Sequence, residues 1–417
     1  MSAVVVTAEY GGPVSIGPPV ALLPDQPTFG ERHTIMRISF TPAENGFSFS
    51  NGFTNHVLRI PAVGVDITTR GRCGGMAAAA MDYWYAGLAM STNGTLPQDG
   101  SLVGDYVYAR LMDTFVDNGL KFVQYATSLD HPTWLRGKGV ARMTREDELP
   151  KLKTRLNSGQ PVLLGLTQAR SVTELGNDHQ VVAYGWEQDS RYTYVLVYDN
   201  NNPGQEVRLR LTTVDDPAER AITGSNGKTW RGLFVESYAR KVPSYLADGR
   251  VIHDSTDPRI MVIRGGGQFW VPSPAEFDAC GLRWDAVVSA KSGSMAHVAT
   301  HPGNGTLVRE RGTDPIHVVY GGKAFWIPSP EVFEGLGLDW GKVREIPQGT
   351  LAGLRSMPLD RTLLRERSAD PVWLVDGGRL RHVTSQAVMD RLGLEWGCVR
   401  VVPDGALAGL ATGTPIT

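Results

Sequence analysis

The first residue of this sequence whose type and position suit covalent chemistry is a cysteine in a glycine turn. Cys73 lies in the segment 71–76, which leads directly into alanines and other helix formers. This order predicts a helix that begins at the cysteine. At such a position the unpaired backbone N–H groups and the helix dipole favour the thiolate over the thiol. The segment is typical of a nucleophile, although a lone cysteine is also a common small core residue.

Two glycines follow the cysteine inside the predicted helix. Gly74 and Gly75 are poor helix formers, so their presence indicates close approach by another backbone or by a ligand. Asp82 lies nine positions after Cys73, about half a turn round the helix, and is not expected to pair with the thiol.

A histidine and an aspartate are predicted to face each other across a hairpin. Two apolar segments on either side of Asp189 predict antiparallel strands with the turn centred near that residue. This register places His179 opposite Asp199, with Cβ atoms about 4.5–5.5 Å apart, so the carboxylate can orient the imidazole. Cys73 as nucleophile, His179 as general base and acid, and Asp199 as orienting group are therefore the candidate catalytic residues. Each also has a structural explanation, as a satisfied histidine or a turn-initiating aspartate.

The elements that must position these residues are helices first and strands second. Helices are predicted to begin at Cys73 and to cover residues 101–119 and 147–156. Strands are predicted over residues 36–40, 161–166, 179–186, 192–199, 206–211 and 229–238, with a short strand and turn over 46–53. Residues 36–243 therefore form an α+β domain, and the Pro- and Gly-rich residues 1–35 form an extended lead-in.

The order of these segments is similar to that of a known family. The segments that carry the resemblance, besides the one at Cys73, are residues 157–166, 177–185 and 197–204. The succession resembles bacterial papain-like cysteine peptidases, including relatives of the bacteriocin-processing peptidases, over residues 36–243. The resemblance implies a papain-like domain with N-terminal helices and a C-terminal antiparallel sheet. It implies the triad Cys73, His179 and Asp199, a peptide or protein substrate, and a thioester acyl-enzyme.

The sequence departs from the family just before the cysteine. Papain-like enzymes usually carry a glutamine there that completes the oxyanion hole, and residues 65–72 contain none. The backbone N–H of Cys73 and a side chain of Asn51, Asn55 or Thr69 are the candidate donors. Arg72 is expected on a solvated turn, although it would help to lower the pKa of the thiol if it leaned inward. Loss of one donor costs about 100- to 1000-fold in rate, so a catalytically degenerate scaffold with a binding or structural role stays an alternative. An acyl transferase of transglutaminase type uses the same three residues and stays open as well.

Residues 250–417 repeat themselves with a period of 56 residues. The segment 306–311 recurs as 362–367, and the segment 269–277 recurs as 325–333. Each of three copies predicts a hairpin, a short helix and a last strand, and such units bury a shared core by stacking. The copies resemble C-terminal modules appended to actinobacterial proteins, so we expect them to target the hydrolase.

The tryptophans of the copies fall into two classes. The first class recurs in every copy and is expected in the core. Its members are Trp284, Trp340 and Trp396. The second class comprises Trp270 and Trp326, which become His382 in the third copy, so this position tolerates polarity and is expected to be exposed in at least one copy. These two tryptophans are the candidate contacts to a glycan or protein ligand, although a more polar end-capping copy explains the change equally well.

Composition sets limits on partners and compartment. The 417 residues have a formal net charge of -2, which gives no electrostatic case for nucleic acid or an anionic membrane. No stretch approaches 18 apolar residues and no basic leader begins the chain, so we expect a cytoplasmic protein, or one released without a classical signal peptide. Three distant cysteines argue against disulfides, and Cys280 is expected to fill the core. The Cys and His spacing is not that of a metal site, and no cofactor is expected.

Overall fold

The computed structural model describes residues 34–54, 58–60, 65–67, 71–130 and 138–417. The predicted lead-in over 1–35 therefore lies almost entirely outside the described residues. The described chain is mixed α+β and divides into two compact units. The first unit comprises the described residues up to 38 together with 120–197 and 206–236, and the second comprises 39–119, 198–205 and 237–417. The predicted domain boundaries at 36, 243 and 250 stay a prediction.

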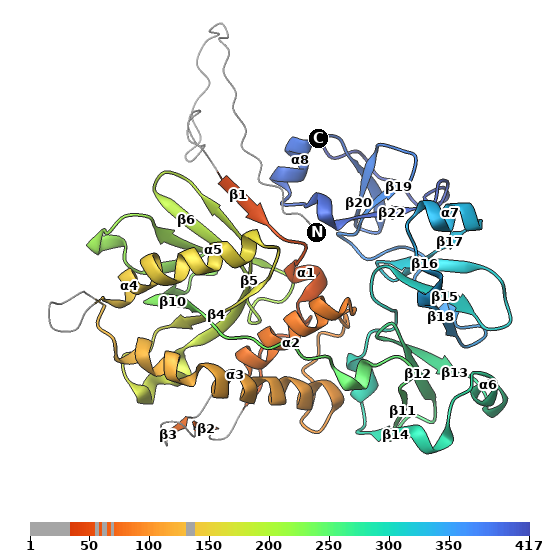
Figure 1. Ribbon diagram of the computed structural model, residues 1–417, viewed down its shortest axis with the longest axis horizontal. Coiled ribbons are helices and arrows are strands. Elements are labelled where there is room, and N and C mark those ends of the chain that lie inside the picture. The colour runs from red at the N-terminus through yellow and green to blue at the C-terminus, as the bar shows by residue number, and fades with distance from the viewer. Residues whose placement is uncertain (1–33, 55–57, 61–64, 68–70, 131–137) are drawn as a thin grey trace, which may run out of the picture. The chain divides into compact units, whose positions relative to one another are not determined.

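The first unit is built on one sheet, which has eight strands among the described residues. Its strands are β1 (Thr34–Arg37), β4 (Val162–Thr167), β5 (His179–Gln188), β6 (Tyr192–Tyr198), β7 (Glu206–Thr212), β8 (Ile222–Gly224), β9 (Thr229–Trp230) and β10 (Gly232–Val235). Their order is β10-β4-β5-β6-β7-β8-β9, and β1 also pairs with β5 (Figure 1). The predictions for β4 to β7 are confirmed to within two residues at each end. Residues 229–238 instead form two short strands, and no strand is assigned over 46–53.

A helical segment packs on this sheet and begins earlier than its sequence predicts. It consists of α4 (Val140–Met143), the π-helical turn η1 (Thr144–Glu148) and α5 (Leu149–Asn157). The prediction that it begins at Asp147 is wrong because the preceding turn is held by the sheet. Thr144 Oγ1 accepts the N–H of Leu233 at 3.0 Å, and Glu148 Oε2 accepts the N–H of Val235 at 2.8 Å. Both partners lie in β10, about 90 residues further on.

In the second unit the helix α2 begins at the cysteine. The helices of the 39–127 segment are α1 (Pro42–Asn45), α2 (Cys73–Ala86) and α3 (Leu102–Thr127), of which α3 contributes residues to both units, and β2 (Leu58–Ile60) pairs with β3 (Val65–Ile67). The helix predicted over 101–119 thus continues to Thr127. A Cβ atom at Gly75 would collide with the carbonyl oxygen of Val107 in α3. Close approach of another backbone is therefore confirmed at Gly75.

A buried carboxylate holds α2 to its neighbours within this unit. Asp82 has no exposed surface and lies 2.7 Å from Arg110 Nε of α3. Its oxygens also accept hydrogen bonds from the hydroxyls of Tyr106 and Tyr238, each at 2.7 Å, and from the N–H of Lys241 at 2.8 Å. The segment after residue 236 is therefore anchored on α2 and α3.

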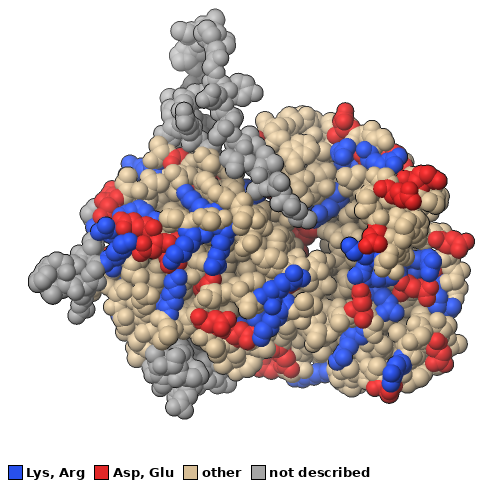
Figure 2. Space-filling view, in the orientation of Figure 1, with Lys and Arg blue, Asp and Glu red and all other residues tan. Residues whose placement is uncertain are grey.

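Residues 250–417 form three sheets of the same design. The first contains β11 (Val251–Asp254), β12 (Ile260–Arg264), β13 (Gly267–Val271) and β14 (Val287–Ala290), with α6 (Pro274–Ala279). The second contains β15 (Thr306–Glu310), β16 (Ile316–Tyr320), β17 (Lys323–Ile327) and β18 (Val343–Ile346), with α7 (Pro330–Gly335). The third contains β19 (Leu363–Glu366), β20 (Val372–Asp376), β21 (Arg379–Val383) and β22 (Val399–Val402), with α8 (Gln386–Arg391). In each sheet three antiparallel strands are followed by a fourth that pairs in parallel with the first (Figure 1). On the face shown in Figure 2, acidic and basic side chains are interspersed over these sheets.

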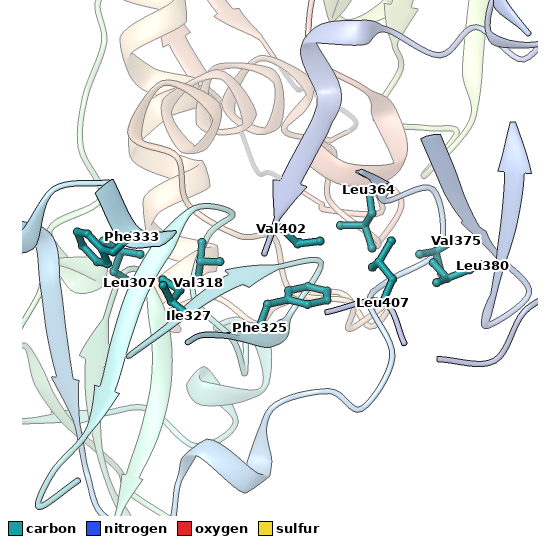
Figure 3. Packing of buried hydrophobic residues seen from close by; sticks show 10 residues of the cluster. All are labelled: Leu307, Val318, Phe325, Ile327, Phe333, Leu364, Val375, Leu380, Val402 and Leu407. Atoms are coloured by element: carbon teal, nitrogen blue, oxygen red, sulfur yellow. The ribbon is translucent and has the colours of Figure 1, made fainter. Parts of the chain in front are cut away.

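Neighbouring copies share their cores. One cluster joins five side chains of the second copy, Phe325 and Phe333 among them, to five of the third, Leu364 and Val402 among them (Figure 3). A second cluster joins side chains of the first copy to Val308, Val319 and Ile346 of the second copy. Each copy therefore completes its apolar burial against its neighbour.

The tryptophans that recur in every copy are not in the core. Trp284, Trp340 and Trp396 are 51%, 49% and 53% exposed, so the prediction of burial is wrong. Each begins a 3₁₀ turn, η5 (Trp284–Ala286), η7 (Trp340–Lys342) or η9 (Trp396–Cys398). In the first two copies the ring stacks on a buried phenylalanine, Phe277 or Phe333, at a centroid distance of 3.9 Å. One ring face covers the core and the other meets solvent, a distinction that recurrence in the sequence does not reveal.

Cys280 is half-buried rather than enclosed in the core. Its Sγ lies 3.5 Å from Glu276 Oε1, and burial together with this carboxylate raises the pKa of the thiol to about 11. Among the described residues, no helix combines the length and the apolar character needed to span a membrane.

Candidate active site

The cysteine stands where the sequence places it, at the first residue of α2. Cys73 is half-buried, and the first helical hydrogen bond runs from the N–H of Met76 to the carbonyl of Arg72 at 2.9 Å. The turn before it needs glycine, because Gly71 has a φ of 117° and a Cβ there would collide with the side-chain amide of Asn51. The thiol is thus carried on a fixed turn at a helix N-terminus.

Asn51 is the candidate oxyanion donor that the structure describes, and Asn55 and Thr69 lie outside the described residues. Asn51 Oδ1 accepts the N–H of Arg72 at 2.6 Å, and the N–H of Asn51 donates to the carbonyl of Asn200 at 3.1 Å. The amide oxygen of Asn51 faces the turn backbone. The other polar atom of this amide, Nδ2, is a donor and also lies beside the turn.

The residue after the candidate aspartate also holds the cysteine. Asn200 Nδ2 donates to the carbonyl oxygen of Cys73 at 3.1 Å. Within the second unit, the chain at 51, the turn at 71–73 and the loop at 200 are therefore tied together. Sequence reasoning missed Asn200, although its place directly after Asp199 in an Asn-rich turn could have indicated it.

Arg72 does not lie on a solvated turn as expected. Its side chain is buried, its guanidinium donates to the carbonyl of Gly104 at 3.0 Å, and it pairs with Asp99 at 2.5 Å. The guanidinium also lies 4.5 Å from the ring centroid of Phe53. Arg72 therefore attaches the turn before the cysteine to the start of α3.

Asp199 follows β6 and is buried. One of its oxygens accepts the N–H of Asn201 at 2.9 Å, and its carbonyl accepts the N–H of Asn202 at 2.8 Å. The turn-initiating role that the sequence left open is thus present. Asp199 belongs to the second unit together with Cys73.

His179 is the first residue of β5 and belongs to the first unit. It is 6% exposed, and its ring lies nearly parallel to that of Trp230, with centroids 5.7 Å apart and an interplanar angle of 12°. Sequence reasoning missed Trp230, because nothing local connects it to a histidine about 50 residues earlier. The stacked indole restricts the plane in which the imidazole can lie.

The hairpin that carries the histidine turns at Ser190 and Arg191, slightly later than predicted, because the N–H of Asp189 donates to the carbonyl of Tyr192 at 3.0 Å. β5 and β6 are neighbours in the sheet, and Asp189 Oδ1 accepts the N–H groups of Arg191 and Tyr192 at 2.8 and 2.6 Å. The register that sets His179 opposite Asp199 stays a prediction. So does the approach of His179 to Cys73, because the two residues belong to different units.

A second carboxyl group, Glu236, is bonded to the residue that follows the histidine and was not anticipated. Gln180 Nε2 donates to Glu236 Oε2 at 2.7 Å, and Glu236 is 1% exposed. Its other oxygen has no hydrogen-bond partner among the described residues. Burial raises the pKa of Glu236 to about 8, so the carboxyl group is mostly protonated at pH 7.

Comparison with known proteins adds little. No family model matches the chain, and no curated protein sequence matches it. Among solved structures, one match is a chain of the periplasmic assembly from the ESX-5 inner membrane complex, with 14% identity, 41% of this chain and 67% of that chain covered, and a TM-score of 0.12. A likeness this small carries no argument about fold or function. The fold and the site thus define a mixed α+β protein with a half-buried cysteine at a helix start, and within the described residues no group of three or more His, Cys, Asp or Glu is placed to hold a metal ion.

Proposed function

We propose that this protein is a cysteine hydrolase that cleaves a peptide or amide bond, and that its C-terminal copies direct it to its target. The thiolate of Cys73 attacks the carbonyl carbon, and the imidazole of His179 takes the thiol proton and gives it to the leaving amine. A thioester remains. Water then attacks the thioester with His179 as base, which releases the carboxylic acid and restores the thiol. Asp199 orients the imidazole, and the N–H of Cys73 with Nδ2 of Asn51 stabilises the oxyanion.

The observation that supports this proposal most is the way the cysteine is held. Two asparagine side chains bond the backbone on either side of it, Asn51 at the N–H of Arg72 and Asn200 at the carbonyl of Cys73. A nucleophile must be placed within a fraction of an ångström, and fixed backbone groups provide this. A small core residue has no need of two such contacts.

The proposal requires the imidazole of His179 to reach the thiol of Cys73, at about 4 Å or less. Alkylation with iodoacetamide at about pH 6, followed by peptide mass analysis, tests this directly. Cys73 should react fast and His179→Ala should slow it strongly, whereas the matched variant His253→Ala should leave the rate unchanged. Cys280 and Cys398 are internal references, since burial raises the pKa of their thiols to about 11 and about 12.

Two other outcomes decide between the alternatives. Labelling of Cys73 that appears only near pH 8.5 and ignores His179→Ala overturns the hydrolase and favours a degenerate scaffold that binds rather than cleaves. A reactive Cys73 whose acyl-enzyme yields an amide when a primary amine is supplied identifies an acyl transferase of transglutaminase type.

A further inference from the structure

One face of each C-terminal sheet carries a cross-strand pair that joins the second strand to the third. In the first copy Met261 of β12 lies opposite Trp270 of β13, and in the second copy His317 lies opposite Trp326. In the third copy the pair is Trp373 and His382. The tryptophan lost at position 382 thus returns on the neighbouring strand, so the second and third copies carry the same pair with the strands exchanged.

Trp270 and Trp326 are exposed, whereas Trp373 packs against the core shared by the second and third copies. Trp326 lies between the buried residues Phe325 and Ile327, so it points to the opposite face of the sheet. Trp270 and Trp326 are 46% and 56% exposed, and Trp373 is half-buried with its ring centroid 5.5 Å from that of His382. An exposed indole contributes little to the fold and costs hydration free energy. Its recurrence in the first two copies therefore points to a ligand.

In the first copy the exposed tryptophan, Trp270, lines a groove. The groove has a volume of about 740 Å³, within the range of sites that hold small molecules. Trp270 lines it together with Met261, Gln268 and the pair Asp257 and Arg259. Arg259 and Asp257 bind each other at 2.6 Å, so this wall is polar but carries no net charge. Thr350, which follows the last strand of the second copy, also lines the groove.

The charge pattern gives no electrostatic case for a polyanion and favours a neutral ligand. Acidic and basic residues are equal in number over residues 250–417. Figure 2 shows them interspersed, without a patch of one sign over these sheets on the visible face. Burial lowers the pKa of His317 below its usual range, so the imidazole beside Trp326 is neutral at pH 7.

The spacing of the tryptophans indicates the form of the ligand. Each sheet offers one flat apolar ring with polar neighbours, far less than the roughly 800 Å² that a stable protein interface buries on each partner. The site recurs with the chain period of 56 residues. A set of small, similar sites suits a polymer of small, similar units, because several weak contacts then act together. Units with apolar ring faces and hydroxyl edges match an indole flanked by amide and hydroxyl side chains.

We propose that the three C-terminal copies bind a neutral polysaccharide, with sugar rings on the exposed Trp270 and Trp326 and on the half-buried Trp373, and with one such unit in the Trp270 groove. The proposal rests on the targeting role given to the copies above but not on the chemistry of Cys73.

Co-sedimentation of the full chain with insoluble cellulose, chitin or starch granules at about 0.15 M salt tests this proposal. At least one of the three should retain the protein. The triple variant Trp270→Ala, Trp326→Ala, Trp373→Ala should bind at least about tenfold more weakly, and each single variant less so, because the contacts add through avidity. The matched control is the triple variant Trp284→Ala, Trp340→Ala, Trp396→Ala, which removes as many half-exposed indoles from the other class and should still bind.

Failure to bind any of the three polysaccharides overturns the proposal, and so does equal loss in both triple variants. Single Trp326→Ala keeps the test decisive if a triple variant does not fold, as judged by its thermal melt. Alkylation of Cys73 should be the same in the tryptophan variants and in the wild type. A failure of polysaccharide binding is therefore distinguishable from a failure of the proposed hydrolase.

Discussion

Two buried carboxyl groups, one in each unit, differ in how they are satisfied. In the second unit Asp82 faces Arg110, two tyrosine hydroxyls and a backbone N–H, all within 2.8 Å. In the first unit Glu236 receives one hydrogen bond, from Gln180, and its second oxygen has none among the described residues. Lys121, whose charge lowers the pKa of Glu236, is bonded instead to Glu148 and to the carbonyl of Val235.

The difference separates a structural acid from a candidate functional one. A carboxylate with four donors contributes to stability only while all its partners are present, so Asp82 acts as a joint between α2, α3 and the chain after residue 236. Glu236 is kept neutral at a cost to the fold, and its hydrogen-bond partner Gln180 directly follows His179 in the sequence. Strongly perturbed acids gather at functional sites, and this one lies on the strand system that carries the candidate histidine.

The largest expected effect comes from removing the satisfied carboxylate. Asp82→Ala leaves Arg110 buried and without its main counter-ion, so we expect a loss of about 3–5 kcal/mol in the free energy of unfolding. Chemical denaturation measures it. The control Asp117→Ala, an exposed aspartate on α3, should change stability by less than about 0.5 kcal/mol. Equal effects of the two substitutions would contradict the role of Asp82 as a joint.

Removing the poorly satisfied acid, Glu236, should raise the free energy of unfolding at high pH, whereas removing Asp82 lowers it. The pKa of Glu236 is about 8 in the folded protein and about 4.3 in an unfolded chain, so the folded state binds the extra proton between these values. The stability that this proton gives is present below about pH 4 and lost as the pH rises through 8. The wild type should therefore lose about 1 kcal/mol per pH unit between about pH 5 and 8 relative to Glu236→Gln. Thermal melts across this range test it. In the control Glu334→Gln, which replaces an exposed glutamate, the melting temperature should vary with pH as it does in the wild type.

The single donor to Glu236 offers a smaller and sharper test. The hydrogen bond from Gln180 lowers the pKa of this carboxyl, so Gln180→Leu should raise it further. We expect about 1 kcal/mol of destabilisation at pH 7 and a pH-dependent decline that extends to higher pH. A decline that keeps the wild-type midpoint would show that Gln180 does not act on Glu236.

These acids also mark what the sequence could and could not predict. β4 to β7 were found because apolar runs bounded by turn residues are local signals, and the start of α2 because Gly71 and the alanines adjoin the cysteine. Asp82 and Glu236 were not, since their partners lie up to about 160 residues away and a carboxylate in a sequence does not disclose its burial. The π-helical turn before α5 was missed for the same reason, because β10 holds it from a distance.

The candidate site divides in the same way. The place of Cys73 was predictable from neighbouring residues. The buried contact of Arg72 with Gly104 and the two asparagine contacts depend on segments that only folding brings together. The recurring tryptophans failed for a different reason. Repetition indicates that a side chain is needed but not how deeply it is buried. Trp340 covers Phe333 with one face of its ring, and the ring therefore stays half exposed.

The smallest expected effect extends the comparison to two buried tyrosines. Tyr125 in the first unit is 1% exposed, its ring packs on Phe234 at 4.6 Å, and its hydroxyl has no hydrogen-bond partner among the described residues. Tyr198 is equally buried in the second unit, but its hydroxyl accepts the N–H of Phe47 at 3.1 Å. Tyr125→Phe should therefore be neutral or stabilising by up to about 1 kcal/mol, whereas Tyr198→Phe should cost about 1–3 kcal/mol because it leaves a buried N–H unpaired. Denaturant midpoints of the two variants measure the difference. A clear loss in Tyr125→Phe would mean that its hydroxyl is satisfied after all, and the contrast between the two units would then rest on Glu236 alone.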